Sequence, residues 1–216
     1  MNTFRTILPA LALLAVGGCV IAPSAGPTTP DGLQKRPSSR VDSVYAAPGA
    51  SLVKYRKVML DELDVAFKAD WQTRRPGISA NEIGDIRALG ASLFRAAFSS
   101  ELEKGGYPVV TAPGPDVLRV KASVVDVDFA PASAAAAGVA GAYIVSTADI
   151  SLLAELRDSQ SGAVIARVID RNRGRNQGNL QMSSDANPSK EALQAFSTWA
   201  GLLRDALDEA RKPISK

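Results

Sequence analysis

Residues 117–129 read VLRVKASVVDVDF, and the alternation in this stretch decides the fold class. Apolar residues occupy even positions up to Val124 and odd positions from Val125 to Phe129. A period of two is typical of a strand with one buried face. Because one extra residue moves every later side chain to the opposite face, the change of parity predicts a β-bulge near Val124.

The segments on either side of this stretch supply its neighbours in a sheet. After it, residues 148–156 alternate in the same way, and a polar turn at residues 158–162 leads into a returning strand at residues 163–170. Before it, residues 54–63 and 107–110 contain β-forming residues and are predicted as shorter strands. Strands joined by short turns pair in antiparallel fashion.

Two helices are expected to pack on this sheet. The run SANE at residues 79–82 is a capping box, and the apolar residues after it recur at three- and four-residue steps as far as the glycine pair at 105–106. A second helix is expected to begin around Pro188, with an apolar stripe that ends near Pro213. The sequence therefore predicts an α+β domain: a mainly antiparallel sheet of about five strands with two long helices packed on it.

The N-terminal residues have the order of a secretory signal. A short positive stretch at residues 1–5 precedes an apolar run at 7–16, and VGGC at 16–19 places small residues before the cysteine. The last pattern resembles the bacterial lipobox, in which a lipoprotein signal peptidase cuts before a cysteine that already carries diacylglycerol. An apolar run of about ten residues is too short to span a bilayer, which needs roughly 20. We therefore expect residues 1–18 to be removed and Cys19 to be lipidated.

The rest of the chain divides into a tether and one domain. Residues 19–50 carry five prolines among Ser, Thr and Gly and show no apolar period, so they are predicted as a tether. Residues 51–216 have the composition of a single folded domain. Val20 stands where, by analogy with enterobacterial sorting, an Asp would favour retention at the inner membrane. We expect a lipid anchor in the outer membrane, with the domain on the periplasmic side.

The residue types that the chain lacks exclude several kinds of chemistry. It contains no His, and Cys19 is its only Cys, which excludes the commonest general base, a catalytic thiol, most zinc sites and any intramolecular disulfide. The formal charge is +3, and it falls to +2 once the signal with Arg5 is removed. A charge this small argues against nucleic acid as a partner. We predict no catalytic residue, no metal, no cofactor and no enzymatic activity.

Four arginines form a candidate site for an anion. Arg167, Arg171, Arg173 and Arg175 alternate along the end of a predicted strand and the polar segment after it. Guanidinium groups bind phosphate or carboxylate bidentately, so the set suits a lipid headgroup or an anionic wall polymer. The alternative is that these residues form the solvated end of a hairpin.

Acidic residues form a second candidate site. Asp61, Glu62 and Asp64, together with Asp126 and Asp128, provide the paired carboxylates that glycoside hydrolysis uses, one as acid and the other as base or nucleophile. Adjacent acidic residues on a strand more commonly mark a solvated face, and this is the alternative interpretation.

Several segments together resemble a known family. In chain order they are YRKVMLD at 55–61, GYPVV at 106–110, GPDVLRV at 114–120, SGAVIAR at 161–167, and Trp199 with LRDAL at 203–207. Their order and spacing, across about residues 50–210, are similar to those of an uncharacterised bacterial lipoprotein family, domain of unknown function 3313. The resemblance implies an exported lipoprotein with no assigned activity, and it carries over no catalytic or binding residue.

These observations lead to one expected function and two alternatives. We expect a membrane-anchored cell-envelope lipoprotein with a non-enzymatic interaction or structural-support role, whose partner is another envelope protein or peptidoglycan. One alternative is a binding module for an anionic envelope polymer or lipid headgroup, through the four arginines. The other is a carboxylate-dependent cell-wall hydrolase.

Overall fold

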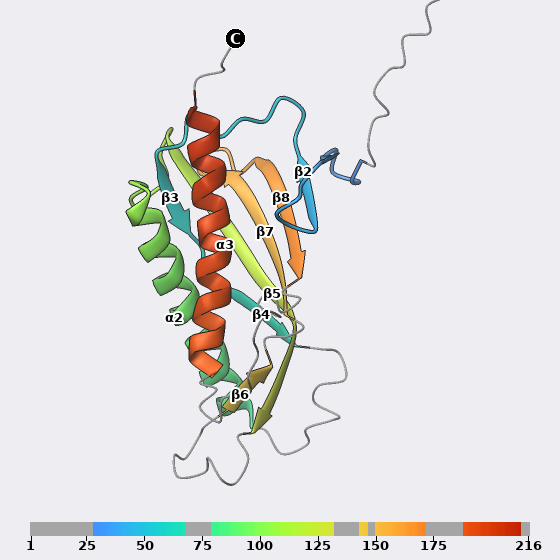
Figure 1. The fold of residues 1–216 in the computed structure, drawn as a ribbon, viewed down its shortest axis with the longest axis vertical. Coiled ribbons are helices and arrows are strands. Elements are labelled where there is room, and N and C mark those ends of the chain that lie inside the picture. The colour runs from blue at the N-terminus through green and yellow to red at the C-terminus, as the bar shows by residue number, and fades with distance from the viewer. Residues whose placement is uncertain (1–27, 68–78, 132–142, 147–149, 172–187, 213–216) are drawn as a thin grey trace, which may run out of the picture.

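Two long helices and one sheet make up the fold in the computed structural model, which describes residues 28–67, 79–131, 143–146, 150–171 and 188–212. Helices α2 (Ala80–Lys104) and α3 (Pro188–Arg211) run side by side in front of the sheet (Figure 1). The strands, in chain order, are β1 (Gln34–Arg36), β2 (Ser43–Ala46), β3 (Lys57–Leu60), β4 (Asp64–Phe67), β5 (Val117–Pro131), β6 (Tyr143–Ser146), β7 (Ser151–Asp158) and β8 (Val164–Arg171).

The sheet is mixed, and its strands follow the order β1-β2-β8-β7-β5-β3, with β4 and β6 also paired to β5. β3 and β4 run parallel to β5, whereas the other pairs are antiparallel. The parallel pairs arise because α2 carries the chain back between β4 and β5, as a crossover helix does. The predicted α+β class with two packed helices is confirmed. The prediction of about five strands is wrong, because the described residues alone form a sheet of eight.

Two of the additional strands lie inside the predicted tether. β1 pairs with β2, and β2 pairs with β8 at positions such as Tyr45 and Arg167. Strands of three and four residues are too short for an alternating pattern to be visible in the sequence. The folded domain therefore begins at or before Thr28, and the predicted tether is too long. Cys19 and the rest of residues 1–27 lie outside the described residues.

The pairing of β4 with β5 contains an irregularity at the predicted place. Val65 lies opposite Val124, but Phe67 lies opposite Val127. β5 therefore holds one extra residue in this interval, which confirms the predicted bulge. On the edge of β5 opposite β4, the pairing with β7 keeps one register through Val125.

The prediction of a strand at residues 107–110 is wrong. Within this segment, Val109 forms a single bridge to Val58 of β3. The bridge rests on two hydrogen bonds, from Val58 N to Pro108 O and from Val110 N to Val58 O. Pro108 has no N–H to extend the ladder, so the segment makes one contact with the edge of the sheet and does not become a strand.

Both ends of α2 follow the predicted signals. Ser79 Oγ accepts a hydrogen bond from Glu82 N at 3.3 Å, and Glu82 Oε2 accepts one from Ser79 N at 2.7 Å, which completes the capping box. Gly106 has a φ of +74° just beyond the helix, a left-handed conformation that favours glycine. A Cβ on Gly105 would lie 2.6 Å from Cγ of Arg204, so this glycine lets α3 approach closely.

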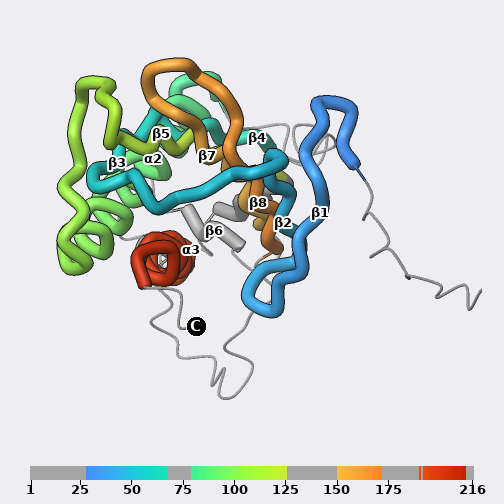
Figure 2. Tube along the Cα trace, turned by 90° about the horizontal axis from the view of Figure 1, so that it is seen from above, coloured from blue at the N-terminus to red at the C-terminus, as the bar shows by residue number. Residues whose placement is uncertain are grey.

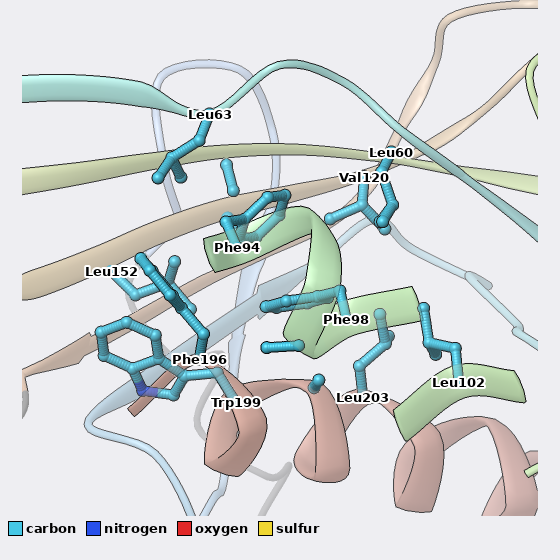
Figure 3. Close-up of a cluster of buried hydrophobic side chains, with 14 of the residues drawn as sticks. Leu60, Leu63, Phe94, Phe98, Leu102, Val120, Leu152, Phe196, Trp199 and Leu203 are labelled. Atoms are coloured by element: carbon cyan, nitrogen blue, oxygen red, sulfur yellow. The ribbon is translucent and has the colours of Figure 1, made fainter. Parts of the chain in front are cut away.

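The core lies between the helices and the sheet. Phe94 and Phe98 of α2 lie with ring centroids 4.3 Å apart, and Phe196 of α3 meets Phe94 edge-on at 5.7 Å. Figure 3 shows these rings beside Val120 and Leu152 of the sheet. All five side chains are buried. This aromatic layer holds both helices on the same face of the sheet.

Candidate functional site

The face of the sheet away from the helices carries polar side chains in register. Lys121 of β5 lies opposite Glu155 of β7, which lies opposite Arg167 of β8, which in turn lies opposite Tyr45 of β2. Side chains alternate between the two faces of a strand, and the neighbouring Ala154 belongs to the core beneath the helices. These four residues therefore lie on the helix-free face, and we call them the polar row.

Arg167 lies at the centre of the polar row and bonds two carboxylates. Its Nη2 lies 2.8 Å from Oε1 of Glu155 and 2.7 Å from Oδ2 of Asp31, and its Nε lies 3.1 Å from Glu155 Oε1. Glu155 also accepts hydrogen bonds from Arg157 of the same strand at 2.6 and 3.0 Å. The guanidinium predicted to bind an external anion is thus already bonded to carboxylates of the domain itself.

Asp31 belongs to a turn that leads the chain into β1. Thr29 Oγ1 accepts a hydrogen bond from Leu33 N at 3.0 Å, and the Leu33 side chain is buried. We call residues 28–34 the N-terminal turn. Arg167 ties this turn to β8 through Asp31, so the point at which the chain enters the domain is fixed.

The ion pairs shift the pKa values of the groups that form them. The hydrogen bond from Arg167 lowers the pKa of Asp31 to about 2. Burial acts to raise the pKa of Glu155, but hydrogen bonds from Arg157 and Arg167 outweigh it and lower the pKa. Hydrogen bonds to Asp31 and then to Glu155 raise the pKa of Arg167. All of these groups are therefore charged at neutral pH, and they largely neutralise one another.

Replacing Arg167 with Leu is expected to release Asp31. The titration midpoint of the Asp31 carboxyl, followed by NMR, should rise from about 2 toward the value of about 3.9 that an unpaired Asp shows. A carboxyl whose pKa is lowered by folding stabilises the fold above pH ~3.9, and this contribution is lost as the pH falls toward about 2. The pH dependence of unfolding of the variant should lack that step.

Arg157→Leu is the matched control, because Arg157 donates to Glu155 and makes no contact with Asp31 within the described residues. This variant should leave the Asp31 midpoint near 2. If both variants raise the midpoint equally, or if neither does, Arg167 is not the residue that holds the N-terminal turn.

The structure does not bring the four predicted arginines together as one anion site. Arg171 ends β8 on the same face as Arg167, and its backbone N–H donates to Asp42 Oδ2 at 3.1 Å. Arg173 and Arg175 lie outside the described residues. The structure therefore describes two of the four predicted arginines. Arg167 forms ion pairs with carboxylates, and Arg171 is exposed.

The predicted acidic residues have different surroundings in the structure. Asp61, which follows β3, accepts hydrogen bonds from Arg119 Nε through both carboxylate oxygens, at 2.8 and 3.0 Å. Glu62 and Asp64 are exposed. The side chains of Asp126 and Asp128 lie outside the described part of β5. Asp61 therefore ties the end of β3 to β5 by an ion pair.

The sequence-based predictions omit Asp170, whose side chain is buried with 1% exposed. Its Oδ2 accepts a hydrogen bond from Trp199 Nε1 at 2.8 Å, and its Oδ1 accepts one from Asp42 N at 3.2 Å. Asp170 thus joins β8 to α3 and to the start of β2. Its position in phase with the helix-facing Val168 is the sequence signal that could have found it.

A second polar cluster lies where α3 ends. Tyr107 is buried, and its hydroxyl donates to Asp208 Oδ1 at 2.6 Å. Burial, followed by this hydrogen bond, raises the pKa of Tyr107 to about 12, so the phenol stays neutral. The guanidinium of Arg211 lies 4.1 Å from the centroid of the Tyr107 ring and donates to Tyr55 O at 3.2 Å. These contacts hold the end of α3 against the sheet.

Two features are absent from the described ranges. No group of three or more His, Cys, Asp or Glu side chains is placed there to hold a metal ion. No helix in those ranges combines the length and the apolar character needed to cross a bilayer.

Fold and site together define a small α+β domain with two helices on one face of a mixed sheet and ion-paired side chains on the other. Comparison with family models then gives its membership. The chain belongs to the family described as protein of unknown function (DUF3313), whose model matches residues 25–203. The match includes β1 and β2, in agreement with a folded domain that begins within the predicted tether.

Two solved structures resemble the chain at low TM-scores. The PelC dodecamer from Paraburkholderia phytofirmans is 15% identical, the alignment covers 73% of this chain and 96% of that one, and the TM-score is 0.39. A neuraminyllactose-binding hemagglutinin homolog from Helicobacter pylori is 16% identical, with 76% and 89% covered and a TM-score of 0.32. No curated protein matches. At these TM-scores the two likenesses carry no argument about function.

Proposed function

We propose that this protein is a cell-envelope lipoprotein, anchored through Cys19 in the outer membrane with its domain in the periplasm. Its role is interaction or structural support, and its partner is another envelope protein or peptidoglycan. The signal-like residues 1–18 and the VGGC pattern support the anchor, and Val20 supports the outer membrane.

The observation that carries the proposal is the fixed entry of the chain into the domain. Asp31, Leu33 and Arg167 hold the N-terminal turn in place. Eight residues separate Cys19 from Thr28, where the described part of the domain begins. A chain of that length reaches at most about 30 Å, so a lipid on Cys19 would keep the domain close to the membrane surface.

The chemistry of the chain supports a role other than catalysis. The sequence has no His and no Cys besides Cys19. In the part that the structure describes, Asp61, Glu155 and Asp158 are each bonded to a cationic side chain. The hydrogen bond from Lys54 lowers the pKa of Asp158, and the arginine partners of Glu155 lower its pKa against the effect of burial, so both are poor general acids at neutral pH. These pairs suit the stabilisation of a sheet better than acid–base catalysis.

Site-specific photocrosslinking in cells tests the interaction role. A photoreactive residue in place of Lys121 samples the helix-free face, and one in place of Leu89 samples the exposed side of α2. We expect one of the two faces to give a crosslinked product with an envelope protein or peptidoglycan, identified by mass spectrometry. The other face serves as the control for random collisions. If neither position gives a product, the interaction role is wrong.

A further inference from the structure

The outermost strand, β1, carries two cations that have no partner among the described residues. Lys35 and Arg36 are exposed, and neither makes an ion pair or a side-chain hydrogen bond within the part of the chain that the structure describes. By contrast, the nearby Arg40 lies 2.7 Å from Glu209 Oε1. The positive charge of β1 is therefore available to a partner outside the domain.

β1 is also the first strand after Cys19 in the part of the chain that the structure describes. Thr28 forms a bridge with Gln34, the residue before Lys35, so the chain enters the described domain beside these cations. The eight residues between Cys19 and Thr28 limit the distance from the lipid to this point to about 30 Å. Figure 2 shows β1 at the end of the molecule far from α2, so a membrane next to β1 would leave α2 accessible.

We propose that the β1 edge, defined as Lys35 and Arg36 on the two sides of this outer strand, docks edge-on on anionic phospholipid headgroups of the membrane that holds the lipid of Cys19. The proposal rests on the anchor proposed above. A guanidinium bonds phosphate oxygens bidentately and an ammonium attracts them as a point charge. Each such cation at an anionic surface strengthens binding about fivefold. Docking turns a domain attached at one point into a domain with a defined orientation.

A charged outer strand has a second physical use, because it discourages edge-to-edge pairing between molecules. Charge of either sign serves that purpose, whereas docking on an anionic surface requires positive charge. The double variant Lys35→Glu with Arg36→Glu, called the β1-edge variant, therefore separates the two roles. It keeps the edge charged but turns attraction for the membrane into repulsion.

The test uses the mature lipidated protein in vesicles, with a fluorophore on one introduced cysteine. Ser39→Cys places the fluorophore close to the β1 edge, and Ser100→Cys places it on α2; both serines are exposed. Cys19 is the only cysteine of the chain, and its sulfur carries the lipid, so labelling is specific. A quencher on the lipid headgroup reports contact in vesicles of phosphatidylcholine mixed with phosphatidylglycerol, or of phosphatidylcholine alone.

We expect strong quenching at Ser39 in the anionic vesicles, and weak quenching at Ser100 or in phosphatidylcholine alone. The β1-edge variant should lower the ratio of docked to undocked protein by at least about 25-fold, from about fivefold for each cation. The matched control is Lys190→Glu with Lys212→Glu, which changes the net charge equally at exposed positions of α3 and the residue after it. It should leave the quenching at Ser39 unchanged.

Two outcomes would overturn the docking: quenching at Ser39 no stronger than at Ser100, and quenching that persists in the β1-edge variant. Failure of the anchor is seen separately, because protein without a lipid does not sediment with the vesicles after a salt wash. That result would overturn the anchor and, with it, the docking.

Discussion

Replacing Trp199 with Ala is expected to lower the free energy of unfolding by about 4 kcal/mol, as for other buried aromatic residues. The indole is buried, its ring centroid lies 6.0 Å from that of Phe196, and its Nε1 donates to Asp170. Truncation removes the packing and also takes a donor from a buried carboxylate, so both losses act in the same direction. Urea denaturation followed by circular dichroism measures the change.

Trp199→Phe separates the hydrogen bond from the packing. Phe keeps most of the ring but has no N–H, and we expect a loss of about 2 kcal/mol. Phe196→Leu is the matched control, since it removes aromatic packing beside Trp199 without removing a hydrogen bond, and it should cost at most about 1.5 kcal/mol. If Trp199→Phe costs no more than this control, the bond to Asp170 does not stabilise the fold.

Local signals in the sequence predicted much of the fold. The capping box at Ser79, the glycine pair that ends α2 and the bulge after Val124 each depend on a few neighbouring residues, and each is confirmed. β1 and β2 depend instead on the edge of β8, which comes far later in the chain. The parallel pairing of β3 with β5 likewise depends on where α2 packs. Short segments held by distant partners carry little local signal.

The residues of the candidate site were likewise predictable only in part. Arg167 was predictable as a strand residue, but its partner Asp31 lies 136 positions away in the chain, and the pattern of arginines does not reveal that carboxylate. The sequence therefore suggested an external anion where the domain supplies its own. Asp170 differs, because its place among helix-facing residues of β8 is visible in the sequence and marks it as buried.

Replacing Cys19 with Ala is expected to release the protein from the membrane completely. Each buried methylene of an acyl chain contributes about 0.8 kcal/mol, and several chains hold a protein durably. The attraction of the β1 edge for headgroups is weaker and depends on ionic strength, so a wash at high salt removes it. After such a wash, only the lipid retains the domain.

Cell fractionation of this variant is the most direct test of the central claim that a lipid on Cys19 ties the domain to a membrane. An ordinary cleavable secretory signal replaces residues 1–18 in the variant, so that no uncut apolar segment holds it on the bilayer. Ser24→Ala, in the segment after Cys19 of an otherwise unchanged chain, is the matched control. We predict that the parent and Ser24→Ala proteins remain in the washed membranes. The Cys19→Ala protein should appear in the soluble periplasmic fraction, and its circular dichroism spectrum should match that of the parent. Cys19→Ala protein that remains with the washed membranes would contradict the lipid anchor.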